Sequence, residues 1–180
     1  MTEEISIIKA VLDGDTESFC LLVQRYEKPV TRMIANLIND RHACQDIAQE
    51  VFLAAYKKLA CFDPARSSFS TWLFTIARNK SISAMRTRRT PAAASAPDRM
   101  NLSDPADALS RDELFARLDR ALSALRPRHR RALVLAEFEN LSYEQIAQIE
   151  GVRIGTVRSR IHRAKSKLRS VLGSPDGGAP

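Results

Sequence analysis

The clearest structural pattern in the chain lies in the segment SYEQIAQIEGVRIGTVRSRIHRAKSKLRSVL (Ser142–Leu172). The segment opens on a capping box, in which a Ser hydroxyl and a Gln side chain satisfy free amides at the start of a helix. Gly151 follows a short apolar repeat, and glycine readily adopts the left-handed backbone that commonly ends a helix. The pattern predicts a short helix from Ser142, a turn over residues 151–153 and a longer helix from Ile154 to Leu172.

The longer predicted helix has one apolar side and one strongly basic side. Its apolar stripe consists of Val157, Ile161, Ala164, Leu168 and Val171. The stretch from Arg153 to Arg169 holds seven cations and no acid. A short helix followed by a basic amphipathic helix is typical of a DNA-binding helix-turn-helix, and a merely solvated basic face is the alternative.

A recognition helix of this kind presents its outer face to the major groove while flanking cations reach phosphates. We therefore predict base contacts by Arg158, Ser159, His162 and Arg163. The predicted phosphate contacts are Arg153, Arg160, Lys165 and Lys167, and Thr156 completes the predicted interface.

Apolar residues also recur at helical spacing along most of the remaining chain, as in Ile7, Ile8, Val11 and Leu12. The long segment from Thr87 to Asp107 lacks this periodicity and is interrupted by prolines, which indicates a flexible linker. We predict an all-α fold of two small helical domains joined by that linker. The predicted ranges are an N-terminal domain over residues 1–89, a linker over 90–107, a C-terminal helix-turn-helix domain over 108–172 and a disordered tail over 173–180.

A second basic block lies in the N-terminal half. From Arg66 to Arg89 the chain holds six cations and no acid, interleaved with Phe69, Trp72 and Phe74. Cations interleaved with aromatic rings are typical of sites that hold single-stranded nucleic acid. Helical spacing places Phe69 and Trp72 on one apolar face, so a core position for Trp72 is favoured over a stacking platform.

A polar edge precedes this block. Asp46, Gln49 and Glu50 share one side of a predicted helix, with Phe52 and Leu53 nearby. An acidic and polar edge beside apolar positions suits docking on a basic helical partner. The alternative is a surface helix packed within its own domain, and Phe52 is expected to be core in either case.

Composition narrows the class of protein. A formal net charge of +7 and a pI of about 9.7 suit nucleic acid or an acidic membrane surface. The chain shows no apolar run near ~18 residues and an acidic N-terminus, so we expect neither a membrane span nor an export signal, and a cytoplasmic protein. No glycine-rich nucleotide loop, metal-ligand cluster or nucleophile–base pair is visible, so we expect no cofactor, no metal and no catalytic residue.

The cysteines, Cys20, Cys44 and Cys61, are widely spaced and show no metal-site or disulfide pattern. We expect buried thiols in a reducing compartment. A redox-sensing role for Cys44 or Cys61 is the alternative.

Three stretches together resemble one protein family. They are CQDIAQEVFLAAYKKL (Cys44–Leu59), FDPARSSFSTWLFTIARNKSISAMRTRR (Phe62–Arg89) and RHRRALVLAEFENLSYEQIAQIEGVRIGTVRSRIHRAKSKLR (Arg128–Arg169). In this order, the chain from Val11 to Leu172 resembles bacterial RNA polymerase sigma factors of the extracytoplasmic-function (ECF) group of the sigma-70 family. A helix-turn-helix alone would be weak support, whereas both motifs in one chain of this length are specific.

The resemblance implies a promoter-specificity subunit with no catalytic activity of its own. Its partners would be promoter DNA, the RNA polymerase core through the clamp helices of the largest subunit, and an anti-sigma factor, without an obligate homo-oligomer. The polar edge at Asp46 would bind the clamp helices, and the C-terminal helix would bind the minus-thirty-five duplex. A loop from Phe62 to Ser70 would receive a base flipped from the minus-ten element. The minus-ten set would comprise Arg66, Phe69, Arg78, Asn79, Lys80 and Arg86.

Two other classes of protein fit part of the pattern. A dimeric helix-turn-helix regulator, acting without being a polymerase subunit, would explain the C-terminal domain but leave the polar edge and the first basic block without a task. A DNA-processing enzyme such as a recombinase would need an exposed Ser or Tyr nucleophile among arginines; the tyrosines are Tyr26, Tyr56 and Tyr143.

Overall fold

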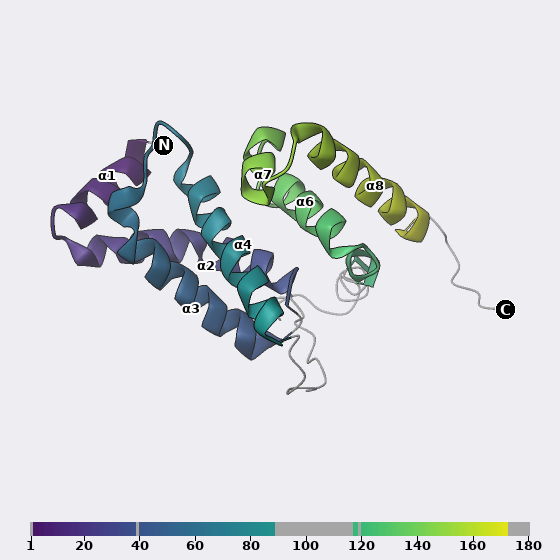
Figure 1. Cartoon of the computed structure of the whole chain (residues 1–180), viewed down its shortest axis with the longest axis horizontal. Helices are drawn as coiled ribbons and strands as arrows, with labels where there is room; N and C mark the ends of the chain where they lie inside the picture. The colour runs from purple at the N-terminus through teal and green to yellow at the C-terminus, as the bar shows by residue number, and fades with distance from the viewer. Residues whose placement is uncertain (1, 39, 89–116, 119, 173–180) are drawn as a thin grey trace. The chain divides into compact units, whose positions relative to one another are not determined.

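The computed structural model describes residues 2–38, 40–88, 117–118 and 120–172, which form helices and turns (Figure 1). None of these residues lies in a β-strand. Contacts divide the chain into two compact units, which confirms the predicted all-α fold with two helical parts. The predicted linker (residues 90–107), the predicted tail (173–180) and residues 108–116 of the predicted C-terminal domain lie outside the described residues.

The first unit is a small helical bundle. Its elements are α1 (Thr2–Leu12), η1 (Thr16–Ser18), α2 (Phe19–Ala35), α3 (Arg41–Lys57), η2 (Leu59–Cys61) and α4 (Phe69–Arg88). Helices α2, α3 and α4 pack against one another, and α1 packs on α2 and η2 (Figure 1). The core between them contains Leu22, Ile34, Val51 and Leu73, all fully buried.

Side-chain caps fix where two of these helices begin. Asp40 precedes α3, and its carboxylate accepts a hydrogen bond of 3.1 Å from the Ala43 amide. Ser68 precedes α4, and its hydroxyl accepts one of 3.3 Å from the Thr71 amide. Each cap satisfies one of the amides that a helix leaves free in its first turn.

The predicted apolar face of α1 is confirmed for Ile8 and Val11, which are buried, but not for Leu12, which is 51% exposed. One residue turns a helix by about 100°, so Leu12 leaves the face that Val11 occupies. The expectation of buried thiols holds only for Cys44, whose Sγ lies 3.3 Å from the Ile38 carbonyl oxygen. It is wrong for Cys20 and Cys61, which are exposed at the start of α2 and in η2.

The second unit contains helical residues 120–123, α6 (Pro127–Glu137), α8 (Ile154–Leu172) and the part of α7 (Tyr143–Glu150) up to Ala147. Helices α6 and α8 pack against each other. Val157, Ile161 and Ala164 of α8 are buried, as the apolar stripe predicts, and Leu168 is half-buried. Leu135 of α6 is buried as well. Val171, at the end of that stripe, is exposed instead, because it lies in the last turn of the helix.

The helix-turn-helix forms as predicted from the sequence. The Ser142 amide donates to the Gln145 side chain at 2.8 Å, and the Gln145 amide donates to the Ser142 hydroxyl at 3.2 Å. Gly151 has a φ of +63°. The Val152 amide donates to the Ala147 carbonyl at 3.0 Å and the Gly151 amide to the Gln148 carbonyl at 3.3 Å, which is the Schellman pattern of a glycine-ended helix. None of the described helices is long and apolar enough to cross a membrane.

Replacing Gly151 with Ala tests this turn. A side chain in the left-handed region costs about 1–2 kcal/mol, and the added methyl group would meet no atom within 4 Å, so the loss is conformational. We expect the free energy of unfolding of the second unit to fall by about 1 kcal/mol, measured by denaturation of the full chain with amide exchange in α7 and α8.

Gly155→Ala is the matched control. Gly155 also has open space where a Cβ would lie, but it lies in the first turn of α8 without a left-handed backbone, where replacing Gly by Ala stabilises by about 0.4–1 kcal/mol through the unfolded state. This variant should therefore stabilise the unit. Equal effects of the two substitutions would contradict the assignment.

Candidate nucleic-acid interface

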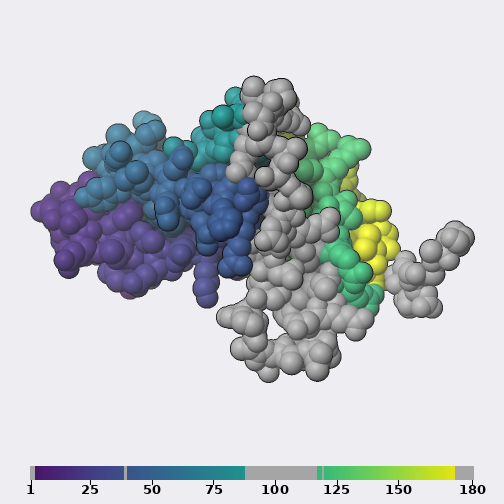
Figure 2. Space-filling view, turned by 90° about the horizontal axis from the view of Figure 1, so that it is seen from below, coloured from purple at the N-terminus to yellow at the C-terminus, as the bar shows by residue number. Residues whose placement is uncertain are grey.

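The outer face of α8 carries most of the residues predicted to contact a DNA duplex. Its packing stripe at Val157, Ile161 and Ala164 is buried, so the remaining positions must face outward. Arg153, Thr156, Arg158, Ser159, His162, Arg163 and Lys167 are exposed, and Arg160 and Lys165 are half-buried. The yellow end of α8 reaches the surface in Figure 2. The helix thus offers polar groups along one face with cations on either side.

Lys165 differs from the other cations of this face. Its Nζ lies 2.7 Å from a carboxylate oxygen of Glu137, at the end of α6. The hydrogen bond to Glu137 raises the pKa of Lys165. An exposed ion pair contributes little to stability, so Lys165 can exchange Glu137 for a phosphate at small cost.

Cations at the start of α6 extend the basic surface beyond the predicted set. Burial, followed by the positive charges of Arg128, Arg163, Arg126 and Arg160, lowers the pKa of His129. Two of these arginines belong to the start of α6 and two belong to α8, so both helices contribute to one cationic region. The sequence from Arg126 onward is rich in cations, so the contribution of α6 could have been predicted. The predicted site nevertheless included only residues from Arg153 onward.

The loop between η2 and α4 is folded back by a turn at Asp63. The Asp63 carboxylate accepts a hydrogen bond of 2.9 Å from the Ala65 amide, and the Asp63 carbonyl accepts one of 3.1 Å from the Arg66 amide. Arg66 also forms an ion pair with Asp63 at 3.3 Å, and its side chain is 85% exposed. The turn therefore presents a cation at the surface of the first unit.

An aromatic cluster supports this loop. The Phe69 ring centroid lies 5.5 Å from that of Tyr26, 5.6 Å from that of Phe62 and 5.6 Å from that of Trp72. Phe69 is only 3% exposed. The structure therefore places Phe69 in the core, where its ring supports the loop, and gives no support to a direct contact between Phe69 and DNA.

The remaining predicted minus-ten residues lie farther along α4. Arg78 donates a hydrogen bond of 3.1 Å to the Asn79 side chain, and Lys80 donates one of 2.9 Å to Glu50 of α3. Arg86 is exposed closer to the end of the helix. At 3.6 residues per turn, Arg78 lies roughly two and a half turns from Phe69, so the loop and this group form two separate parts of the surface.

Helix α3 carries the predicted partner-binding edge. Asp46, Gln49 and Glu50 are exposed, and Leu53 is 54% exposed although it is apolar. Phe52, which was included in the predicted set, is buried and belongs to the core. The two neighbours differ because Leu53 continues the helical spacing of Asp46 and Gln49, whereas Phe52 lies on the buried side of α3.

The partner-binding edge of α3 also includes Tyr56, which the predicted set does not contain. Tyr56 lies three positions after Leu53, is exposed, and its ring contacts Phe19 of α2 edge-on at 5.2 Å. The spacing Asp46, Gln49, Leu53, Tyr56 alternates three and four residues, which marks one helix face. That spacing was available in the sequence.

In the part of the chain that the structure describes, no group of three or more His, Cys, Asp or Glu side chains is placed to hold a metal ion.

Comparison with known proteins matches both units. Sigma-70 region 2 matches residues 22–90, which cover most of α2 and all of α3 and α4. Sigma-70 region 4 matches residues 115–168, which cover α6, α7 and most of α8. The chain belongs to the sigma-70 family, in its ECF group. Helix α1 precedes the region 2 match.

Two relatives match over nearly their whole length. The chain is 36% identical to the RNA polymerase sigma-H factor of Pseudomonas aeruginosa, with 94% of each protein covered. It is 33% identical to the ECF RNA polymerase sigma factor RpoE of Cereibacter sphaeroides, covering 93% of this chain and 94% of the relative. Its fold matches the sigma factor RpoE of Bartonella quintana, solved with the anti-sigma factor NepR, at a TM-score of 0.73 and 25% identity, covering 89% of this chain and 99% of that chain.

The cations that α6 and α8 place around His129 allow a prediction about the pKa of this residue. Arg163→Ala removes one of the charges that disfavour the imidazolium, so the pKa of His129 should rise toward its ordinary value. An NMR titration of the His129 ring protons measures it. Lys167→Ala is the control, because Lys167 is not among the cations that lower this pKa. An unchanged His129 titration in Arg163→Ala would mean that the two helices do not share one charged region.

Proposed function

We propose that this sigma factor is a promoter-specificity subunit that directs RNA polymerase to transcription start sites without catalysing a reaction itself. The observation that carries the proposal is the presence of two exposed cationic surfaces in two separate units, beside an exposed apolar and acidic face on α3. Two different surfaces suit two different DNA elements, so the target would be asymmetric and a homodimer is not required.

The second unit would bind the minus-thirty-five duplex. In this proposal the N-terminal half of α8 enters the major groove, where Arg158, Ser159, His162 and Arg163 contact base edges. The flanking cations of α8 and the arginines at the start of α6 would contact phosphates on both sides. Because those contacts release condensed counterions, affinity should fall steeply with salt.

The first unit would bind the minus-ten element after the strands separate. The loop that ends at Ser68, with the first turn of α4, would receive one flipped base, while Arg78, Asn79 and Lys80 would hold the strand farther along α4. Flipping a base costs a few kcal/mol, which contacts to a cationic surface and a preformed loop offset. Strand separation would then depend on binding energy and not on nucleotide hydrolysis.

The exposed face of α3 would bind the polymerase core. Asp46, Gln49 and Glu50 offer polar contacts, while Leu53 and Tyr56 offer apolar area that is otherwise exposed to water. In the proposal these residues meet the clamp helices of the largest subunit. The Bartonella relative was solved in complex with an anti-sigma factor. In the proposal, an anti-sigma factor inhibits this chain by covering the same face of α3. Polymerase core should then displace such an inhibitor competitively, and a ternary complex on this face would contradict that mode.

Two substitutions on α8 separate base reading from phosphate binding. Arg163→Ala should relax sequence preference at one minus-thirty-five position, a loss of about 1–3 kcal/mol of discrimination. Lys167→Ala should weaken binding to every sequence and reduce the salt slope by about one. Holoenzyme binding to a set of single-base minus-thirty-five variants, at several salt concentrations, measures both. Unaltered base preference in Arg163→Ala would refute this docking of α8.

A charge reversal tests the polymerase-binding face. Asp46→Arg should abolish capture of the polymerase core in a pull-down, because it places a cation where a basic partner is expected. Gln49→Ala should weaken capture less severely. Glu27→Arg, an equal charge change at an exposed position of α2, is the control and should bind normally. Normal capture by both α3 variants would exclude this face.

A further inference from the structure

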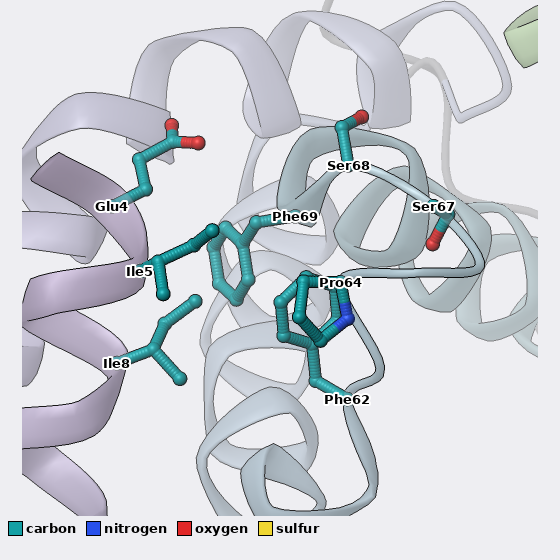
Figure 3. A pocket seen from close by; sticks show the side chains of 8 residues that line it. All are labelled: Glu4, Ile5, Ile8, Phe62, Pro64, Ser67, Ser68 and Phe69. Carbon is teal, nitrogen blue, oxygen red and sulfur yellow. The ribbon is translucent and has the colours of Figure 1, made fainter. Parts of the chain in front are cut away.

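Helix α1 lies outside the residues matched by Sigma-70 region 2, yet it faces the loop that precedes α4. A pocket separates the two, and Glu4, Ile5 and Ile8 line one side of it (Figure 3). The other side is formed by Phe62, Pro64, Ser67, Ser68 and Phe69. Figure 3 shows the side chains of Ile5 and Ile8 directed toward the two phenylalanine rings. Direct packing between α1 and the loop is therefore incomplete.

A hydrogen-bonded connection bridges this incomplete packing. The Tyr26 hydroxyl of α2 donates to the Glu4 carboxylate of α1. Burial, followed by the hydrogen bond to Glu4, raises the pKa of the Tyr26 phenol, so it stays protonated and remains a donor. Arg25, next to Tyr26, lies 3.5 Å from the same Glu4 carboxylate and 2.7 Å from that of Glu3. Glu4 is mostly buried, whereas Glu3 is exposed.

The connection continues into the start of α4. The Tyr26 ring packs on Phe69, the first residue of α4, with the two ring centroids 5.5 Å apart. The Ser70 hydroxyl lies 3.0 Å from that of Ser68, and the Ser68 hydroxyl lies 2.9 Å from that of Thr71. Ser68 caps α4 and ends the loop. Glu4 of α1 is therefore linked through the Tyr26 ring to Phe69, and the Ser68, Ser70 and Thr71 hydroxyls hold the same first turn of α4.

We propose that α1 is a positioning element, in which Glu4 acts through Tyr26 to hold the loop and the first turn of α4 in the arrangement that receives an unpaired promoter base. Glu4 and Tyr26 are thus positioning residues, neither of which contacts DNA. The inference rests on the proposed capture of a base by the loop. Its physical basis is that hydrogen bonds are directional, whereas the apolar contacts across the pocket fix no single spacing.

The test measures base capture by the holoenzyme. Affinity is determined for a single-stranded nontemplate minus-ten oligonucleotide of a promoter that the holoenzyme transcribes, and for the same oligonucleotide with an abasic site at the captured position. The ratio of the two affinities reports the loop alone. Tyr26→Phe keeps the ring on Phe69 but removes the hydroxyl, and Glu4→Ala removes the acceptor. Each should lower the ratio by about threefold to tenfold, the effect of one hydrogen bond.

Two further variants distinguish positioning from simple stabilisation. Glu4→Gln still offers an oxygen to the Tyr26 hydroxyl, so it should keep the ratio within about twofold of the unaltered protein. Glu3→Ala loses only the exposed contact with Arg25 and should keep the ratio unchanged. Capture of the polymerase core is measured in parallel for every variant.

Each outcome decides the proposal. A lowered ratio in Tyr26→Phe and Glu4→Ala, with normal polymerase capture and rescue in Glu4→Gln, supports positioning. Equal losses of affinity for both oligonucleotides, or a parallel loss of polymerase capture, would mean that α1 only stabilises the unit and would overturn it. If the unaltered protein prefers the intact oligonucleotide and every variant shows the same affinity ratio, the positioning role of α1 is overturned while base capture by the loop stands. An unaltered protein that binds both oligonucleotides equally overturns base capture by the loop as well.

Discussion

The packing of the buried Phe69 ring positions the loop and the start of α4 in the first unit. Phe69 is the first residue of α4. Its ring contacts the rings of Tyr26 in α2, Phe62 in the loop and Trp72 in the next helical turn. Aromatic pairs at such separations add about 0.5–1.5 kcal/mol to the gain from burial alone. One side chain thereby fixes the start of α4, and with it the direction in which the later cations of that helix project. The loop keeps its arrangement because the same ring lies beneath it.

In the second unit, the cations of the basic surface repel one another when no anion is bound. Burial, followed by the charges of arginines from both α6 and α8, lowers the pKa of His129, so cations of both helices act on one side chain. The apolar contacts of Val157, Ile161 and Ala164 hold the two helices together against this repulsion. A polyanion would relieve it, so the stability of the fold and the affinity for DNA draw on separate interactions.

Local patterns in the sequence predicted local structure well. The capping box at Ser142 and the left-handed Gly151 depend on neighbouring residues only, and both formed at the expected positions. The exposure of single residues was less predictable, because it depends on which side of a helix meets the core. Phe52 and Phe69 were included in binding sets but are buried, and Tyr56 was omitted but is exposed. The grouping of α6 with α8 required the tertiary fold.

The turn at Asp63 has a thermodynamic consequence for the first unit. Pro64 has a restricted φ, and the hydrogen bonds to Asp63 already hold the next two amides. Much of the conformational entropy that a flexible segment would lose on meeting a ligand is therefore lost when the protein folds. Whatever this loop binds encounters a surface that is already ordered, so a larger share of the contact free energy remains for distorting the ligand.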